Sequence, residues 1–181
     1  MTNIEDLYIS MRFIYNHLLK MKTLIVYATK HGSSEKAANM LKEKLKGELA
    51  VHNIAKKGLP NINNFDAIIV GGSIHAGMIQ KKIKHFCNDN SEHLQKVHLG
   101  LYLCCMYKEE AQMQFDSAYS QELRDSALIN GLFGGEFLFG KMNWFERSIV
   151  KKVVGINKSL SNIDHGAIDR FAEKFNLLPS Q

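Results

Sequence analysis

The chain has 181 residues, of which 45% are hydrophobic and 23% are charged, and its formal charge is +5. This composition excludes a disordered or low-complexity chain and predicts one globular domain with its own hydrophobic core. Three cysteines, an odd number that includes an adjacent pair, fit a reducing compartment better than a disulfide framework. CxxC and HExxH spacings are missing from the sequence, so no metal site is predicted.

The apolar stretches are short, and the longest, 67–70 and 99–107, fall far below the about 20 residues that a transmembrane helix needs. Residues 1–20 carry acidic side chains near their start and lack a small-residue cleavage site, so they do not resemble a signal peptide. We therefore expect a cytoplasmic protein. Met21 directly precedes the first predicted strand, and we interpret 1–20 as an N-terminal extension to a domain of residues 21–181.

From Met21 onward, short β-branched apolar runs alternate with amphipathic stretches, which is typical of a parallel sheet wound with helices. Strands are predicted at 23–28, 49–54, 67–70 and 97–105 and within 129–139, with the third strand ended by Gly71 and Gly72. Helices are predicted at 34–46, from 81, at 109–126, and after an N-cap at Asp164 with Ile168, Phe171, Ala172 and Phe175 facing the core. The expected fold is a doubly wound, three-layer α/β domain with five strands.

Ligands of an open parallel sheet bind beyond the carboxyl ends of its strands, which directs attention to the segments 29–34, 71–77 and 104–109. The first segment combines hydroxyls with a glycine directly before a helix, and such a loop binds phosphate through backbone amides and the helix dipole. Neither a Walker loop nor a GxGxxG fingerprint is present, which disfavours nucleoside triphosphates and nicotinamide dinucleotides. A helix cap that binds no ligand is the alternative interpretation.

The segments 21–27 and 29–34 resemble the first strand and phosphate loop of the flavodoxin family, and 66–77 is similar to the family's second flavin-contacting segment. The resemblance extends from 21 to about 176, and it implies a flavodoxin-like fold with FMN as cofactor. In the first loop it implies FMN binding by Thr29, Lys30, His31, Gly32, Ser33 and Ser34. Around the isoalloxazine ring it implies contacts from Ser73, Ile74, His75, Ala76, Gly77, Cys105, Met106 and Tyr107.

Two of these side chains have a chemistry that suits a flavin. Tyr107 offers an aromatic ring for stacking at the end of a strand, although it also fits a loop residue that covers the core. His75 has an ordinary pKa near neutrality and suits proton exchange at the flavin edge, although a structural hydrogen bond would explain it as well. We expect Cys104 and Cys105 to pack in a strand rather than to act as nucleophiles, and no catalytic acid or base is assigned.

The segment 138–160 is longer than a strand-to-helix connection requires. It holds the single tryptophan, Trp144, and +4 of the formal charge, from Lys141, Arg147, Lys151, Lys152 and Lys158 against Glu146. Apolar residues at helical spacing between the lysines predict a basic amphipathic helix. Such a helix can lie on an anionic membrane surface, and an ordinary surface helix docked on the sheet is the alternative.

Flavodoxins that shuttle electrons are usually acidic, whereas this chain has a pI of about 9.0. The basic insert with its 144–147 sequence Trp-Phe-Glu-Arg resembles that of menaquinone-dependent protoporphyrinogen dehydrogenases. This resemblance implies an FMN-dependent enzyme of haem synthesis, peripheral on the inner face of the cell membrane, that oxidises protoporphyrinogen IX and passes electrons to a membrane quinone.

Two alternatives belong to other functional classes: an electron-transfer flavodoxin without its own substrate, and an interaction protein that binds no cofactor. Nucleic-acid binding is not expected, because the positive charge is concentrated on one apolar-faced segment without a recognition motif.

Overall fold

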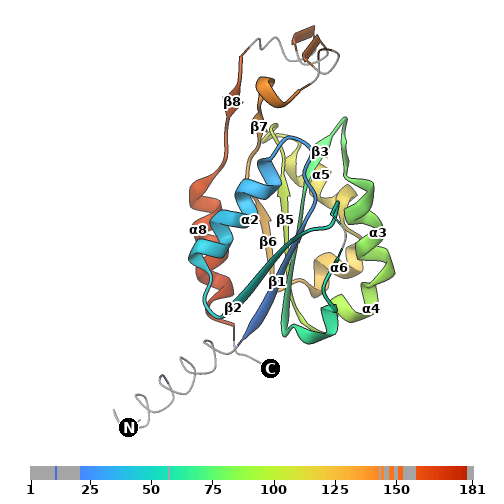
Figure 1. Cartoon of the computed structure of the whole chain (residues 1–181), viewed down its shortest axis with the longest axis vertical. Helices are drawn as coiled ribbons and strands as arrows, with labels where there is room; N and C mark the ends of the chain where they lie inside the picture. Colours follow the sequence, from blue (N-terminus) through green and yellow to red (C-terminus); the bar gives the residue numbers. More distant parts are fainter. Residues whose placement is uncertain are drawn as a thin grey trace.

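The computed structural model describes Met11 and residues 21–56, 58–142, 144, 147–148, 151–152 and 158–178. Its centre is a parallel sheet with the strand order β2-β1-β3-β5-β6 (Figure 1). These strands are β1 (Lys22–Tyr27), β2 (Glu48–Asn53), β3 (Ala67–His75), β5 (His98–Cys104) and β6 (Ile129–Leu132). The predicted five-stranded, doubly wound fold is confirmed.

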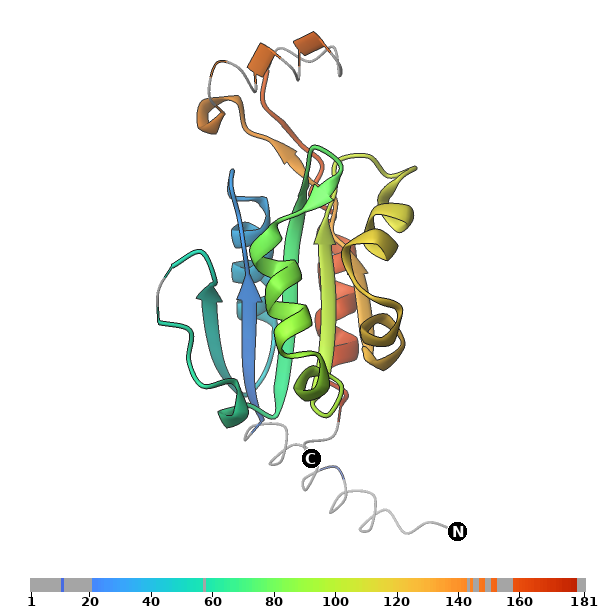
Figure 2. The same cartoon turned by 90° about the vertical axis from the view of Figure 1, so that its right-hand side faces the viewer.

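Helices cover both faces of the sheet (Figures 1 and 2). One face carries α2 (Ser33–Lys44) and α8 (His165–Phe175), and the opposite face carries α3 (Lys81–Asp89), α4 (Ser91–Leu94), α5 (Ala111–Ala118) and α6 (Gln121–Ser126). A short 3-10 turn, η1 (Ile62–Asn64), lies between β2 and β3. The apolar side of α8 is buried as predicted, through Ile168, Phe171, Ala172 and Phe175.

Each face has a separate core because successive side chains of a strand point to opposite sides. In β1, Leu24 and Val26 pack with the α3 to α6 side, whereas Ile25 and Tyr27 pack with α2 and α8. Leu24, Ile25 and Val26 are fully buried, and each contributes about 1.5–3 kcal/mol through the hydrophobic effect. A strand that is buried on both faces has apolar residues at consecutive positions, which explains the apolar run in β1.

Strand β3 does not end at Gly71 and Gly72, so this part of the prediction is wrong. The strand runs through both glycines to His75 and then turns back into β4 (Met78–Ile79), which pairs antiparallel with it. A Cβ at Gly71 would fall 1.8 Å from the ring of Tyr102 on β5, and one at Gly72 would fall 2.7 Å from Ile79. The glycines therefore make room for neighbouring side chains rather than break the strand.

The predicted helix over 109–126 is two helices, and the fifth strand predicted within 129–139 is the four residues of β6. Tyr119 has extended backbone angles between α5 and α6, and its buried hydroxyl donates a 2.7 Å hydrogen bond to the carbonyl of Tyr102. Ser120 then caps α6 by accepting from the amide of Leu123. Strand β6 ends at Leu132, shortly before Gly134, whose φ of +67° is left-handed.

A projection that we call the arm, made of the described residues among 136–161, extends beyond the carboxyl ends of the strands (Figures 1 and 2). Its stem is the antiparallel pair of β7 (Glu136–Phe137) and β8 (Leu160–Ser161), and η2 (Phe139–Lys141) follows β7. Trp144 and residues 147–148 and 151–152 are helical. The other positions of the predicted amphipathic helix between 143 and 157 lie outside the described residues, as do 1–20 except Met11.

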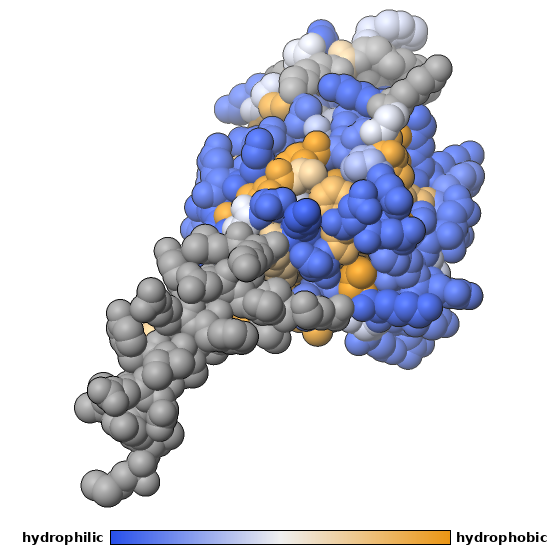
Figure 3. All heavy atoms as spheres, turned by 60° about the horizontal axis from the view of Figure 1, so that its bottom comes forward, coloured by the Kyte–Doolittle hydropathy of each residue, from blue (hydrophilic) through white to orange (hydrophobic). Residues whose placement is uncertain are grey.

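Viewed with the amino end of the sheet toward the reader, the described surface is mostly hydrophilic with hydrophobic patches between the charged groups (Figure 3). Among the residues that the structure describes, no helix has both the length and the hydrophobicity to cross a bilayer.

Candidate functional site at the carboxyl edge of the sheet

The loop after β1 leads directly into α2 at the carboxyl edge of the sheet. Gly32 is the N-cap of α2 and has a φ of +109°, a left-handed conformation that favours glycine. Glycine offers no side chain to accept from the first helical amides, which leaves them available to a ligand. Thr29 Oγ1 accepts a 2.8 Å hydrogen bond from the Gly32 amide and so fixes the fold of the loop.

Two serines follow Gly32 and are buried beneath the loop. The Ser34 carbonyl accepts a 2.9 Å bond from the hydroxyl of Tyr102. Burial raises the pKa of the neighbouring Cys104 thiol to about 12, and a side-chain hydrogen bond with the Ser34 hydroxyl has a smaller, opposite effect. Both side-chain contacts of this turn therefore lie on the buried side of α2.

Two histidines bring the first loop and the β3–β4 hairpin into contact. The ring centroids of His31 and His75 are 4.7 Å apart, with an angle of 52° between the ring planes. His31 is buried and His75 is half-buried, whereas the neighbouring Lys30 is exposed. The structure therefore joins two segments that the sequence assigned to one site.

The hairpin between β3 and β4 closes with a two-residue turn. Ala76 and Gly77 both have left-handed φ angles, of 48° and 78°, as the tight turn of a twisted hairpin requires. Before the turn, Ser73 is engaged at both polar groups: its amide donates to Gln80 Oε1 at 3.0 Å, and its hydroxyl accepts from Gln80 Nε2 at 2.6 Å. Ile74, between Ser73 and His75, is half-buried.

The loop that follows β5 and carries Tyr107 packs on a buried thiol. Cys105 Sγ lies 2.8 Å from Gln114 Oε1 and 3.2 Å from the carbonyl oxygen of Tyr107, and Gln114 donates in turn to Glu110. Burial raises the pKa of the Cys105 thiol, which disfavours the thiolate that nucleophilic attack requires. Above this network Tyr107 is 39% exposed, and Met106 is half-buried.

Two further polar contacts at this edge could not be predicted from the sequence. The hydroxyl of Tyr27 donates to Glu35 Oε1 at 2.9 Å, and burial together with Glu35 raises the Tyr27 pKa to about 12. Lys36 Nζ lies 2.7 Å from Glu136 Oε1, and that carboxylate is only 4% exposed. Residues 36 and 136 are 100 positions apart, so only the folded chain brings them together.

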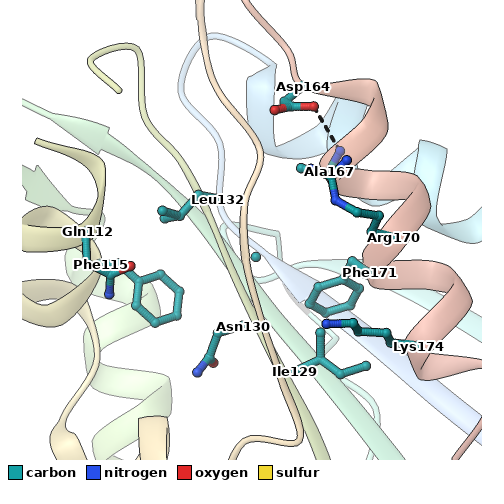
Figure 4. Close-up of a pocket in the computed structure, with 11 residues that line it drawn as sticks. Gln112, Phe115, Ile129, Asn130, Leu132, Asp164, Ala167, Arg170, Phe171 and Lys174 are labelled. Carbon is teal, nitrogen blue, oxygen red and sulfur yellow. Dashed lines mark hydrogen bonds between the residues drawn. The ribbon is translucent and has the colours of Figure 1, made fainter. Parts of the chain in front are cut away.

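A separate hollow of about 330 Å³ lies at the other edge of the sheet, over β6 between α5 and α8 (Figure 4). Phe115 and Phe171 contribute apolar surface to it, and Arg170 and Lys174 of α8 contribute positive charge. Asp164 also lines it, and its carboxylate accepts from the Ala167 amide at 2.9 Å. The predicted site residues do not line this hollow, so it is not part of the candidate site.

The chain is similar in sequence or in fold to several known proteins. Protoporphyrinogen IX dehydrogenase [quinone] of Escherichia coli K12 is 22% identical over 148 residues, which cover 74% of this chain and 79% of that protein. A short-chain flavodoxin associated with a bacterial microcompartment has a TM-score of 0.56 at 15% identity. The match covers 86% of this chain and 96% of that protein. Flavodoxin 1 of Bacillus cereus has a TM-score of 0.53 at 14% identity. The match covers 85% of this chain and 96% of that protein.

At these identities the two solved structures support the fold alone. A family model described as a flavodoxin domain matches residues 24–164, which include the sheet and the three loops at its carboxyl edge. The chain therefore belongs to the flavodoxin domain family.

Proposed function

We propose that the chain binds FMN at the carboxyl edge of its sheet. The FMN phosphate would lie on the loop from Thr29 to Ser34, and the isoalloxazine ring would lie between the β3–β4 hairpin and the loop that carries Tyr107. The order of the sheet reverses beside β1, and β1 and β3 are neighbours there, which is where doubly wound folds bind their ligands.

The observation that carries the proposal is the glycine-capped N-terminus of α2. The amides of its first turn, which no side chain caps, and the positive end of the helix dipole attract a phosphate. Thr29 keeps the loop folded through its bond to Gly32. The exposed ring of Tyr107 is suited to stacking on a flat aromatic ligand.

We further propose that the chain is an enzyme that oxidises protoporphyrinogen IX and passes the electrons to a membrane quinone. The E. coli relative carries this activity in its name, and the resemblance of the basic insert supports the same assignment. FMN, when bound, supplies the redox chemistry. The chain itself would bind the phosphate, orient the ring, and offer His75 of the β3–β4 hairpin as a group that can hold or release a proton.

The arm supports a location of this reaction at a membrane surface. It projects from the same end of the sheet as the three loops (Figure 2). Trp144 is 78% exposed, and the nearby Arg147, Lys151, Lys152 and Lys158 are exposed cations. Exposed aromatic and basic side chains favour binding to anionic lipid headgroups, and salt weakens that attraction.

The first test is titration of the purified protein with FMN, followed by visible absorbance and flavin fluorescence, with riboflavin as the ligand that lacks the phosphate. We expect saturable FMN binding that is tighter than riboflavin binding. Failure to bind FMN would remove the proposed function.

The second test measures quinone reduction with protoporphyrinogen IX as donor, in the presence of anionic vesicles and at two salt concentrations. Turnover that vesicles promote and salt reduces supports the enzyme. FMN binding without turnover, combined with electron exchange with a soluble reductase, would support the electron-transfer flavodoxin instead.

A further inference from the structure

A hollow follows the whole length of β6, the last strand in the order of the sheet. The hollow has a volume of about 330 Å³, and all four residues of Ile129–Leu132 line it together with side chains of α5 and α8 (Figure 4). We propose that an extended acidic segment of another protein adds to β6 as a further strand and fills this hollow. The inference does not depend on the proposed FMN site, because none of that site's residues lines the hollow.

Strand β6 has one neighbour in the sheet. It pairs in parallel with β5, and within the described part of the chain no strand pairs with its other side. The backbone amides and carbonyls on the open side of an edge strand can pair with a chain from outside, which is how some domains bind extended peptides. The hollow lies beside β6, where such an added strand would run.

The two helix layers enclose this space from both faces of the sheet. Figure 4 shows Gln112 and Phe115 of α5 on one side of β6, and Arg170, Phe171 and Lys174 of α8 on the other. Successive side chains of a strand point to opposite faces, so an added strand would direct alternate side chains toward α5 and toward α8. Phe115 on the α5 side favours apolar side chains there.

The α8 side carries two cations at a spacing that suits a strand. Arg170 and Lys174 are exposed and four positions apart, so they lie about 6 Å apart along the helix axis. Alternate residues of a strand are about 6.7 Å apart, and α8 packs against β6. Two acidic side chains at alternate positions of an added strand therefore match the two cations.

Both cations are available to an incoming carboxylate. Among the residues that the structure describes, neither Arg170 nor Lys174 has an acidic partner in an ion pair. Asp164 is the carboxylate that lines the hollow, and it accepts from the Ala167 amide as the N-cap of α8. The positive charge on this side therefore selects acidic segments over basic ones, since unlike charges steer and orient a partner.

The test uses the full-length protein and a fluorescent peptide of alternating valine and glutamate. We expect saturable binding in fluorescence anisotropy and shifts of the β6 amides in two-dimensional NMR spectra. A strand pairs through one of its edges, so N-methylation of one alternate set of peptide nitrogens should abolish binding, whereas methylation of the other set should preserve it. A peptide of the same composition with its valines and glutamates in separate blocks should bind at least about tenfold more weakly.

Charge variants of α8 test the acidic specificity. Arg170→Gln and Lys174→Gln should weaken binding about threefold each and about tenfold together, as exposed ion pairs that act independently do. Lys84→Gln is the matched control, because Lys84 is exposed on α3 and does not line the hollow. Arg170→Glu combined with Lys174→Glu should reject the acidic peptide and bind one of alternating valine and lysine.

Thermal melts establish that each variant is folded. The proposal is overturned if the acidic peptide does not bind, if its affinity ignores the α8 charges, or if both methylated peptides bind equally. Dimers that form without peptide and shift the same β6 amides would also overturn it, because the edge would then accept a second copy of this chain. FMN titration of the same samples reports on the proposed function separately.

Discussion

Replacement of Gly71 by alanine should destabilise the sheet and the phosphate loop together. Gly71 is paired in register with Tyr102, whose fully buried ring lies directly over it. A Cβ at position 71 would meet three ring atoms of Tyr102 at 1.8, 2.0 and 2.3 Å. Both residues belong to interior strands, so the strain must displace the tyrosine ring rather than the backbone.

The cost has two parts. Overpacking of a filled core costs about 1–3 kcal/mol. Displacement of Tyr102 also breaks the 2.9 Å hydrogen bond that its hydroxyl donates to the Ser34 carbonyl, and a buried hydroxyl left without its acceptor costs about 1–3 kcal/mol. A combined loss near the middle of this range, about 4 kcal/mol, lowers the melting temperature of a chain of this size by about 8–16 °C.

Thermal unfolding followed by circular dichroism measures the loss, and FMN titration of the variant at low temperature measures the effect on the loop. Gly140→Ala is the matched control, because a Cβ there would meet no atom within 4 Å. Tyr102→Phe isolates the lost hydrogen bond from the steric term. A Gly71→Ala variant whose melting temperature matches that of Gly140→Ala would show that the contact with Tyr102 does not explain the glycine.

Other substitutions test the loop, the buried thiols and a helix cap. Thr29→Val removes the acceptor of the Gly32 amide and should weaken FMN binding about tenfold with a smaller effect on riboflavin, whereas Thr29→Ser should retain affinity in the same fluorescence titration. Burial raises the pKa of Cys87 and Cys104 from 9.0 to about 12. Between these two values the unfolded chain releases thiol protons that the folded state keeps, so the free energy of unfolding should fall as pH rises from about 9 toward 12. Urea unfolding at pH 8 and 10 should show this loss, and Cys87→Ala should have a shallower pH dependence; equal slopes would contradict the burial argument. Asp164→Ala should cost about 1 kcal/mol because Asp164 caps α8, and Asp164→Asn should retain most of that stability in thermal melts.

The order of elements could be predicted from the sequence because buried parallel strands are locally distinct from amphipathic helices. The strand β1 and the apolar face of α8 fall where the pattern places them. The candidate site was proposed on a related ground. Each of its loops directly follows a predicted strand, and the carboxyl ends of parallel strands share one edge of a sheet.

The parts that could not be predicted depend on contacts between distant residues. Gly71 is required by Tyr102 on the next strand, and nothing in the neighbouring sequence separates that role from a strand break. Gln80 occupies both polar groups of Ser73 only because the hairpin folds back. Tyr119 divides a continuous helical pattern, and its hydroxyl contacts a carbonyl on β5, a strand distant from it in the local pattern.

The two ends of the arm meet at a closed neck. The amide of Asn162 donates to the Gly135 carbonyl at 2.8 Å, and that of Asp164 donates to the Phe133 carbonyl at 3.0 Å. Gly134 is enclosed by this crossing, since a Cβ there would fall 1.9 Å from the Asn162 carbonyl oxygen. A projection that leaves and re-enters through one neck is an exchangeable module: its length and chemistry can diverge among relatives while the sheet beneath keeps the same register.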